Sequence, residues 1–242
     1  MLSDAKKTLI RKLQNKKHRT EMQKCIIEGE KGVFEAIRSG AQVAFIVLAD
    51  SYRGAPIPAE HEIEIFDIFD DEAKKLTSTV TFSGILAVVA IPQAKELVRK
   101  GPIVYLDGIA DPGNLGTIFR TAEWFGITQI VLGPGCSDPY NEKALRASMG
   151  SLFRIVPRVG DPALIEILKQ DGYTITGLDM QGSDDASLLE GNVVLVVGSE
   201  SHGISPELET ALDNRYTIAG GNETESLNAA IAAAIVFSRL TV

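Results

Sequence analysis

The chain is poor in the residues that build disulfide frameworks and metal centres. Its 242 residues include only two cysteines, Cys25 and Cys136, which lie far apart in the sequence, and three scattered histidines. Structural zinc sites need Cys or His ligands at short spacings, and disulfide-rich domains need many more cysteines. We therefore expect free thiols, as in a reducing cytosol, and no bound metal.

Long apolar runs are also missing. The longest is Ala229–Phe237, well short of the roughly 20 residues that span a bilayer. The first residues, MLSDAKKTLI, have lysines but no apolar core behind them, so we expect no signal peptide. With 45% hydrophobic and 23% charged residues, the composition is that of a globular protein. We expect a cytoplasmic protein without a membrane partner.

Positive charge is scarce overall but concentrated near the amino terminus. The net charge is −8 and the pI about 5.0, which argues against a general binder of polyanions. Between Lys6 and Lys24, however, eight Lys or Arg and one acid give +7 and leave −15 for the rest. This run is either a solvated helix surface or a segment that contacts phosphates. The phosphate-contacting candidates are Arg11, Lys16, Lys17 and Arg19.

The hydrophobic pattern divides the chain into two parts and a linker. Residues 1–92 form a small α/β unit, with helices expected over 6–19 and 29–40 and strands over 43–49, 61–68 and 84–91. Residues 93–101 are polar and read as a linker. In residues 102–242 strand and helix patterns alternate, which predicts a parallel sheet with helices on its faces.

Three strand-to-helix corners of the second part carry more polar residues than a turn and a helix cap require. The first reads DGIADPGNLGTIFRTAEWFG (107–126), the second VVLVVGSESHGISPEL (193–208) and the third YTIAGGNETESLNAAIAAA (216–234). The candidate site residues are Asn114 and Arg120 in the first corner, Gly198, Glu200 and Gly203 in the second, and Ser226 and Asn228 in the third.

Ligands of parallel α/β sheets bind outside the carboxyl ends of the strands, so three such corners are expected to converge on one crevice. Glycines let the backbone approach a ligand, and helix amino ends present unpaired N–H groups. Each corner alone is also explained as a turn with a cap, with Ser205 and Ser226 as caps. We expect the helix of the third corner to begin near Ser226, with Asn228 in its first turn.

Several common site motifs are missing from the sequence. No strand is followed by G-x-G-x-x-G, and there is no Walker P-loop, G-x-S-x-G elbow or H-E-x-x-H pair. An α/β enzyme that binds a nucleotide or small metabolite in another way stays open as an alternative.

Taken in order, the three corners resemble the motifs of the SpoU (TrmH) family of RNA ribose 2′-O-methyltransferases, in the SPOUT superfamily. The intervening LRASMGSLFRI is also similar, so the resemblance covers about residues 101–242. The first part resembles the family's ribosomal-protein-like RNA-binding domain through LIRKLQNKKHR, IIEGEKGVFEAI and STVTFSGILAVV. One departure is Ile218-Ala219-Gly220, where the third motif often begins Ile-Pro-Met; we expect a change of loop shape rather than of role.

The resemblance implies a fold, a cofactor and an assembly. The fold would be a parallel-sheet catalytic domain (102–242) with a C-terminal trefoil knot, preceded by the small α/β RNA-binding domain. The cofactor would be S-adenosylmethionine, and the active form a homodimer whose sites are each completed by the neighbouring subunit. Backbone groups of the knotted loops would hold the cofactor, at Gly198, Gly203, Ile218, Ser226 and Leu227.

The resemblance also implies catalytic roles for Asn114, Arg120, Glu200, Ser226 and Asn228. Methyl transfer to a ribose oxygen requires orientation and removal of a proton from a weakly acidic hydroxyl. The family view casts Arg120 as the base, but a guanidinium stays protonated in proteins, so a phosphate-clamping role is equally consistent. Asn114 would hold Arg120 or the ribose, Glu200 would orient the site, and Ser226 and Asn228 would anchor the third loop.

The two-domain layout is more similar to family members that act on large-subunit ribosomal RNA than to those that act on transfer RNA. The expected partner is therefore ribosomal RNA, with the Lys6–Lys24 run as a phosphate-contacting surface. Two alternatives remain open: a tRNA ribose 2′-O-methyltransferase, and an RNA-binding homologue without catalytic activity.

Overall fold

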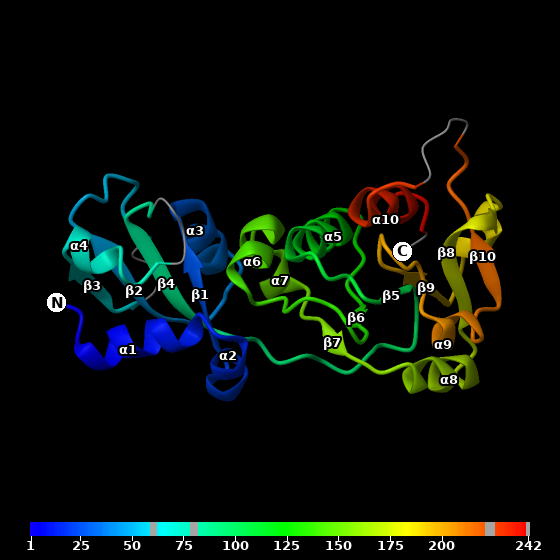
Figure 1. The fold of residues 1–242 in the computed structure, drawn as a ribbon, viewed down its shortest axis with the longest axis horizontal. Coiled ribbons are helices and arrows are strands. Elements are labelled where there is room, and N and C mark those ends of the chain that lie inside the picture. The colour runs from blue at the N-terminus through cyan, green and yellow to red at the C-terminus, as the bar shows by residue number, and fades with distance from the viewer. Residues whose placement is uncertain (59–61, 78–81, 221–225, 241–242) are drawn as a thin grey trace. The chain divides into compact units, whose positions relative to one another are not determined.

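The chain folds into two compact units. The structure is a computed structural model that describes residues 1–58, 62–77, 82–220 and 226–240 (Figure 1). The amino-terminal unit consists of Met1–Gln93 and Asp138–Arg154, and the carboxyl-terminal unit consists of Ala94–Ser137 and Ile155–Val242. Parts of three predicted features lie outside the described residues: the start of the strand expected over 61–68, the STVT of the third amino-terminal segment, and residues 221–225 of the third corner, including Gly221.

The amino-terminal unit is built on a mixed four-stranded sheet in the order β1-β4-β2-β3. β4 pairs antiparallel with β1 and β2, and β3 pairs parallel with β2. The strands are β1 (Lys24–Glu28), β2 (Val43–Ala49), β3 (Ile65–Ile68) and β4 (Ile85–Ala90). The helices of this unit are α1 (Asp4–Leu13), α2 (Lys16–Met22), α3 (Glu30–Arg38), α4 (Asp70–Ala73), α6 (Glu142–Ser148) and α7 (Ser151–Arg154).

The single helix predicted over residues 6–19 is two helices. Asn15 interrupts it, because its side-chain oxygen accepts a hydrogen bond from the Lys17 backbone N–H at 2.9 Å and so caps a new helix. Short polar side chains compete for backbone groups in this way and favour caps over helix interiors. α1 still buries Ile10 and Leu13 against β2 and β4 residues such as Phe45 and Leu86.

Residues 138–154 belong to the amino-terminal unit, whereas the sequence-based division placed them after residue 101. α6 packs against β1. The Arg19 guanidinium lies 2.5 Å from the Asp138 carboxylate, and the two side chains are only 9% and 14% exposed. A division of the sequence based on linker composition could not predict these contacts, because they join residues that are 119 positions apart.

The carboxyl-terminal unit contains a six-stranded sheet in the order β10-β8-β9-β5-β6-β7. All of its strand pairs are parallel, which confirms the parallel sheet predicted from the alternating pattern. The strands are β5 (Ile103–Leu106), β6 (Ile130–Leu132), β7 (Arg158–Val159), β8 (Thr174–Ser183), β9 (Val193–Val197) and β10 (Asn214–Tyr216). The helices are α5 (Pro112–Trp124), α8 (Ala163–Gln170), the 3₁₀ helix η1 (Ala186–Leu189), α9 (Pro206–Glu209) and α10 (Ala229–Phe237).

Helices cover both faces of this sheet, as Figure 1 shows. On one face, Ile165 and Leu168 of α8 and Leu208 of α9 pack against Tyr105 and Val196. On the other, α5 and α10 lie beside each other. Because both faces are buried, β5 and β9 read as continuous apolar runs rather than alternating ones, which is how parallel strands differ from half-exposed antiparallel ones.

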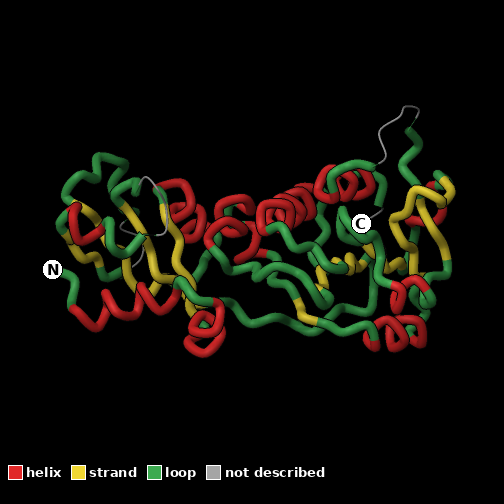
Figure 2. The backbone as a smooth tube through the Cα atoms, viewed as in Figure 1, coloured by secondary structure: helices red, strands yellow, loops and turns green. Residues whose placement is uncertain are grey.

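Two boundaries differ from the predictions. The strand expected over 61–68 is observed only from Ile65, since the described residues 62–64 are not in a strand. α10 begins at Ala229 rather than near Ser226. The segment between β4 and β5 contains no helix or strand (Figure 2), and its residue Leu97 packs against the core of the carboxyl-terminal unit. None of the described helices is long and apolar enough to cross a membrane.

Candidate active site at three strand-to-helix corners

The first corner runs from β5 into α5 and presents Asn114 in the first turn of the helix. Asp111 is the N-cap, and its carboxylate accepts a hydrogen bond from the Asn114 backbone N–H at 2.9 Å. Pro112 occupies the first helical position, where a missing N–H costs nothing. Cap and proline together set where the helix begins, and so where the Asn114 side chain leaves it.

The second corner is a tightly closed loop after β9. The backbones of Ser199 and Gly203 exchange two hydrogen bonds, at 3.0 and 2.9 Å, and Gly203 has φ +66°. A Cβ at Gly198 would lie 2.3 Å from the Gly203 carbonyl carbon, so only glycine fits there. This closure leaves Glu200 exposed at the turn.

The third corner leads from β10 into α10. Asn228 is the N-cap, and its Oδ1 accepts hydrogen bonds from the N–H groups of Ala230 and Ile231 at 3.0 and 3.3 Å. We expected Asn228 in the first turn of this helix, but it precedes the helix as its N-cap. The first N–H groups of a helix have no carbonyl acceptor within the helix, and the Asn228 side chain accepts their hydrogen bonds instead.

Side-chain hydrogen bonds join the three corners. The Asn228 Nδ2 donates to the Asn114 Oδ1 at 3.1 Å, and the Asn114 Nδ2 donates to the Glu200 Oε1. β10 lies two strand positions from β9, yet the residue that caps the helix after β10 reaches a helix that follows β5. The structure therefore brings together three of the five predicted catalytic residues.

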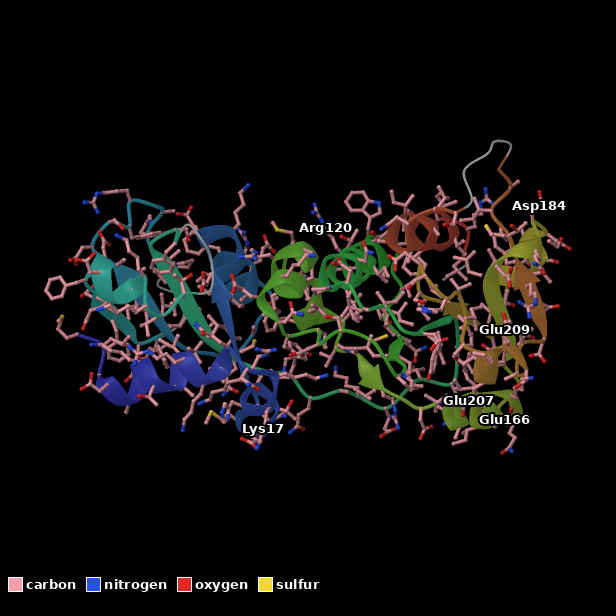
Figure 3. The ribbon with its side chains drawn as sticks, viewed as in Figure 1. Lys17, Arg120, Glu166, Asp184, Glu207 and Glu209 are labelled. Carbon is pink, nitrogen blue, oxygen red and sulfur yellow. The ribbon has the colours of Figure 1, made fainter. Side chains whose placement is uncertain are left out.

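Arg120 lies on the exposed face of α5, about two turns beyond Asn114 (Figure 3). Among the described residues its guanidinium has no hydrogen bond or ion pair. An exposed, unpaired guanidinium can accept a phosphate or another anion without first breaking a salt bridge.

The remaining predicted cofactor residues are less constrained by contacts. Ile218 is half-buried, and Leu227 is 46% exposed. No side-chain bond in the described part of the chain ties Ile218, Ser226 or Leu227 to Asn114 or Glu200, so Ser226 and Leu227 are placed at the site only by their adjacency to Asn228.

Asp107 is a site-building residue that the sequence analysis did not single out. Its buried carboxylate accepts a hydrogen bond from the Ser205 backbone N–H at 2.7 Å, which ties the first corner to the N-cap of α9. Its signal was an acid directly after the buried run IVYL, where the burial of a charge requires a donor.

The predicted phosphate-contacting residues separate into two kinds. Arg11, Lys16 and Lys17 are exposed on α1 and α2, and Figure 3 marks Lys17. Arg19 is only 8% exposed, and besides Asp138 it donates to the carbonyls of Leu13 and Gln14. It is therefore a structural residue and not part of the exposed surface, a correction that composition alone could not supply.

Both cysteines are free. Among the described residues no group of three or more His, Cys, Asp or Glu could hold a metal ion. What the corners offer instead is a carboxylate, two amides and a free guanidinium at the carboxyl end of a parallel sheet. Such a set can orient a hydroxyl and a phosphate and stabilise developing negative charge.

Two family profiles match the chain. The SpoU rRNA Methylase family matches residues 101–238, and the MRM3-like substrate binding domain matches residues 7–87. Among curated proteins, the 23S rRNA (guanosine(2553)-2′-O)-methyltransferase RlmP of Bacillus subtilis is 35% identical over 95% of this chain and 93% of its own length.

Solved structures agree with these matches. A protein from Porphyromonas gingivalis, described as an RNA methyltransferase of the TrmH family, is 34% identical with a TM-score of 0.85, covering 99% of this chain and 98% of its own. An AdoMet-bound rRNA methyltransferase from Sinorhizobium meliloti is 25% identical with a TM-score of 0.81, covering 99% and 95%. The profile spanning all three corners, together with these full-length relatives, shows that the chain belongs to the SpoU rRNA methylase family.

Proposed function

We propose that this protein transfers a methyl group from S-adenosylmethionine to a ribose 2′-hydroxyl of large-subunit ribosomal RNA. The observation that carries the proposal is the hydrogen-bonded series Glu200–Asn114–Asn228, which joins three corners at the carboxyl edge of the parallel sheet. The two amide side chains hold each other in one orientation, and Arg120 on the same helix as Asn114 is free to bind an anion.

The second and third corners fit the cofactor. The closed backbone at Gly198 and Gly203 leaves no side chain in the way of a ligand, and the exposed Leu227 and half-buried Ile218 provide apolar surface for an adenine ring. Backbone groups at Gly198, Ile218 and Leu227, with Ser226, would hold the adenosine portion. When bound, S-adenosylmethionine supplies an electrophilic methyl group on a sulfonium, which is already a good leaving group.

The protein's own task is then to bring a ribose oxygen into line and to stabilise its charge. Arg120 would bind the phosphate beside the target ribose, and its positive charge would favour the oxyanion that develops as the hydroxyl gives up its proton to solvent water. Asn114 orients the ribose by its amide, Glu200 holds that amide in place, and Ser226 and Asn228 anchor the third loop.

Two features favour ribosomal RNA as the substrate. A relative 35% identical over nearly the whole chain is a 23S rRNA 2′-O-methyltransferase, and the amino-terminal unit matches a substrate binding domain. The exposed cations of α1 and α2 (Arg11, Lys16 and Lys17) provide a surface for RNA phosphates. A protein with this activity on ribosomal RNA would work in the cytoplasm.

The assembly and the chain threading are part of the same proposal. A homodimer would cover apolar surface next to the site, where Ile231 of α10 is 54% exposed. A trefoil knot in the carboxyl-terminal unit would account for the way the segment after β10 returns to α5, which follows β5, past the two intervening strands β8 and β9.

The test is methyl transfer from labelled S-adenosylmethionine to three purified RNAs: large-subunit ribosomal RNA, small-subunit ribosomal RNA and transfer RNA. We expect label in the large-subunit RNA at a ribose 2′-oxygen, and the same site unmethylated in cells without the gene. Label in transfer RNA alone would favour the tRNA alternative. Binding of S-adenosylmethionine (the methyl donor) without transfer to any RNA would favour a non-catalytic homologue. Failure to bind this methyl donor would overturn the proposal.

A further inference from the structure

The strand β3 forms an open edge of the amino-terminal sheet. It is the last strand in the order β1-β4-β2-β3, and no strand in the described part of the chain pairs with its outer side (Figure 1). The backbone N–H of Ile46 in β2 donates to the carbonyl of Glu64 at 2.9 Å. Because backbone groups alternate sides along a strand, the N–H and C=O groups of Ile65 and Asp67 point away from β2, to the open edge.

One face of the sheet is also uncovered at this edge. Alternate residues of a strand face opposite sides of the sheet. Phe66 and Ile68 pack into the core beneath α1, whereas Ile65, at 45%, and Asp67 are exposed on the other side. The helix on that other side, α3, packs against β1 and β4, which lie toward the opposite edge. The outer backbone and the outward side chains of β3 are therefore both accessible.

A groove of about 330 Å³ adjoins the edge. It lies between the end of α3, the start of β2 and the residues before β3, and its apolar lining includes Ile37, Val43 and Ile63. Ile63 is two positions before the exposed Ile65, so apolar side chains continue from the groove to the open edge. An open edge next to apolar pockets is the arrangement to which an extended peptide adds as a further strand.

The charge around this edge selects the occupant. Residues 60–72 contain seven acids and no Lys or Arg. Glu64 pairs with Lys6 of α1 at 3.4 Å, but the exposed side chains of Glu62 and Asp67 have no ion pair or hydrogen bond with any described residue. This negative surface repels RNA phosphates, and it equally repels the same edge of a second copy. It attracts the side chains of lysine and arginine.

We propose that the open edge of β3 binds an extended, lysine- and arginine-rich segment of another protein, which adds to the four-stranded sheet as a fifth strand. This interaction goes beyond the proposed function and does not depend on it. Charged edges protect sheets against pairing with themselves. Here the charge has one sign, so the groups that exclude a second copy also select a basic partner. The basic helices α1 and α2 of a second copy cannot add as a strand, because their backbone groups are bonded within the helices.

The first test uses a fluorescent peptide of eight alternating lysine and valine residues, titrated into the full-length protein and followed by anisotropy. We expect saturable binding. The same peptide with methylated backbone nitrogens should bind about 5- to 150-fold more weakly, because the carbonyls of Ile65 and Asp67 lose two donors. A peptide with glutamate in place of lysine should not bind. The proposal is overturned if the lysine peptide does not bind, or if either control peptide binds equally well.

Amide hydrogen exchange, followed by NMR, locates the contact. With the lysine peptide bound, the N–H groups of Ile65 and Asp67 should exchange more slowly, whereas those of Phe66 and Ile68, which already face β2, should not change. Protection that does not include Ile65 and Asp67 would contradict the addition of a strand at this edge.

Two substitutions of Asp67 separate charge from backbone pairing. Asp67→Ala removes one exposed charge and should weaken peptide binding about 1.5- to 5-fold. Asp67→Pro also removes the outward N–H but no bond to β2, and should weaken binding about 2- to 10-fold further. Both variants should keep the wild-type affinity for S-adenosylmethionine, since Asp67 lies outside the three corners. Equal peptide affinities in the two variants would count against strand addition. A smaller solution mass for Asp67→Pro than for wild type would assign the edge to a second copy and overturn the proposal.

Urea unfolding shows whether Asp67→Pro is folded. If it is not, the methylated peptide tests the same edge from the partner's side, with the wild-type protein.

Discussion

The side chain of Asn228 donates to the side chain of Asn114 at 3.1 Å, across 114 positions of sequence. Each asparagine sits at the amino end of a helix, one as the N-cap of α10 and the other three residues after the N-cap of α5. Asn228 therefore serves two purposes: it caps α10, and it ties that end of the helix to Asn114, which in turn donates to Glu200.

Substitutions of Asn228 should separate these two purposes. Asn228→Ala removes both, and we expect a loss of about 1 kcal/mol of stability from the cap together with lower activity. Asn228→Asp keeps an oxygen for the N–H groups of Ala230 and Ile231 but cannot donate to Asn114. Its melting temperature should stay near wild type while kcat falls roughly 2- to 10-fold, the range of one hydrogen bond. Equal activity in Asn228→Asp and wild type would show that the bond to Asn114 has no catalytic effect.

Arg120→Ala should leave folding and donor binding nearly intact, because the guanidinium has no partner among the described residues. We expect a loss of at least about 100-fold in kcat, as for the removal of one preorganised donor at a developing anion. Arg120→Lys should recover little, since an ammonium cannot reproduce a bidentate phosphate contact. Methyl transfer at a near wild-type rate by Arg120→Ala, in an assay with saturating RNA, would remove Arg120 from the mechanism.

Two glycines of the site loops should respond differently to an added methyl group. At Gly198 a Cβ would lie 2.3 Å from backbone atoms of Gly203, so Gly198→Ala must open the loop that presents Glu200. We expect weak or absent donor binding by calorimetry. Gly220→Ala is the matched control, because its Cβ would meet no heavy atom of the described residues nearer than 4.0 Å. Similar donor affinities in the two variants would argue against a role for the closed loop.

Neutralising the exposed cations of the amino-terminal unit should weaken RNA binding, because contacts between these side chains and RNA phosphates are lost. For the triple variant Arg11→Gln, Lys16→Gln and Lys17→Gln, the slope of log K against log salt should flatten by about 2, at ~0.7 per phosphate on single strands. An unchanged slope would exclude this surface.

Arg19 should behave differently from its three neighbours. Removing one partner of its buried pair with Asp138 leaves an uncompensated charge, so Arg19→Ala should cost about 3–5 kcal/mol of stability. Urea unfolding in the absence of RNA measures this loss of stability, which the substitution of a residue that only contacts RNA would not cause.

Cys25 should make stability depend on pH in the alkaline range. Burial raises the pKa of the Cys25 thiol to about 12 from an ordinary value of 9.0. The folded state therefore holds its proton at pH values where the unfolded chain has lost it. This contribution is fully present below pH 9 and is lost between about pH 9 and 12, at most ~1.4 kcal/mol per pH unit. Urea unfolding of wild type and Cys25→Ala at pH 8, 9, 10 and 11 should show the wild type losing stability relative to the variant; parallel curves would contradict the assignment.

The predictions that rested on local pattern agree best with the structure. β2 spans the predicted residues 43–49, and strands and helices alternate from Ile103 onward as predicted. Buried strands can be found in this way because they appear in the sequence as unbroken apolar runs. Local competition for backbone groups was harder to foresee: Asn15 splits one predicted helix and Asn228 precedes another. β1 (Lys24–Glu28) was not predicted, since KCIIE begins with a charge and ends in one.

Apart from Asp107, the residues of the candidate site, its three corners and the family could be named from sequence alone, because glycines, caps and polar side chains give recognisable patterns where strands end. What tertiary structure alone decided is which of those side chains meet. Hydrogen bonds between Asn114, Glu200 and Asn228, the tie from Asp107 to Ser205, and the burial of Arg19 against Asp138 all join distant segments. Such contacts depend on sheet order and packing, which a linear pattern of hydrophobic and polar residues does not encode.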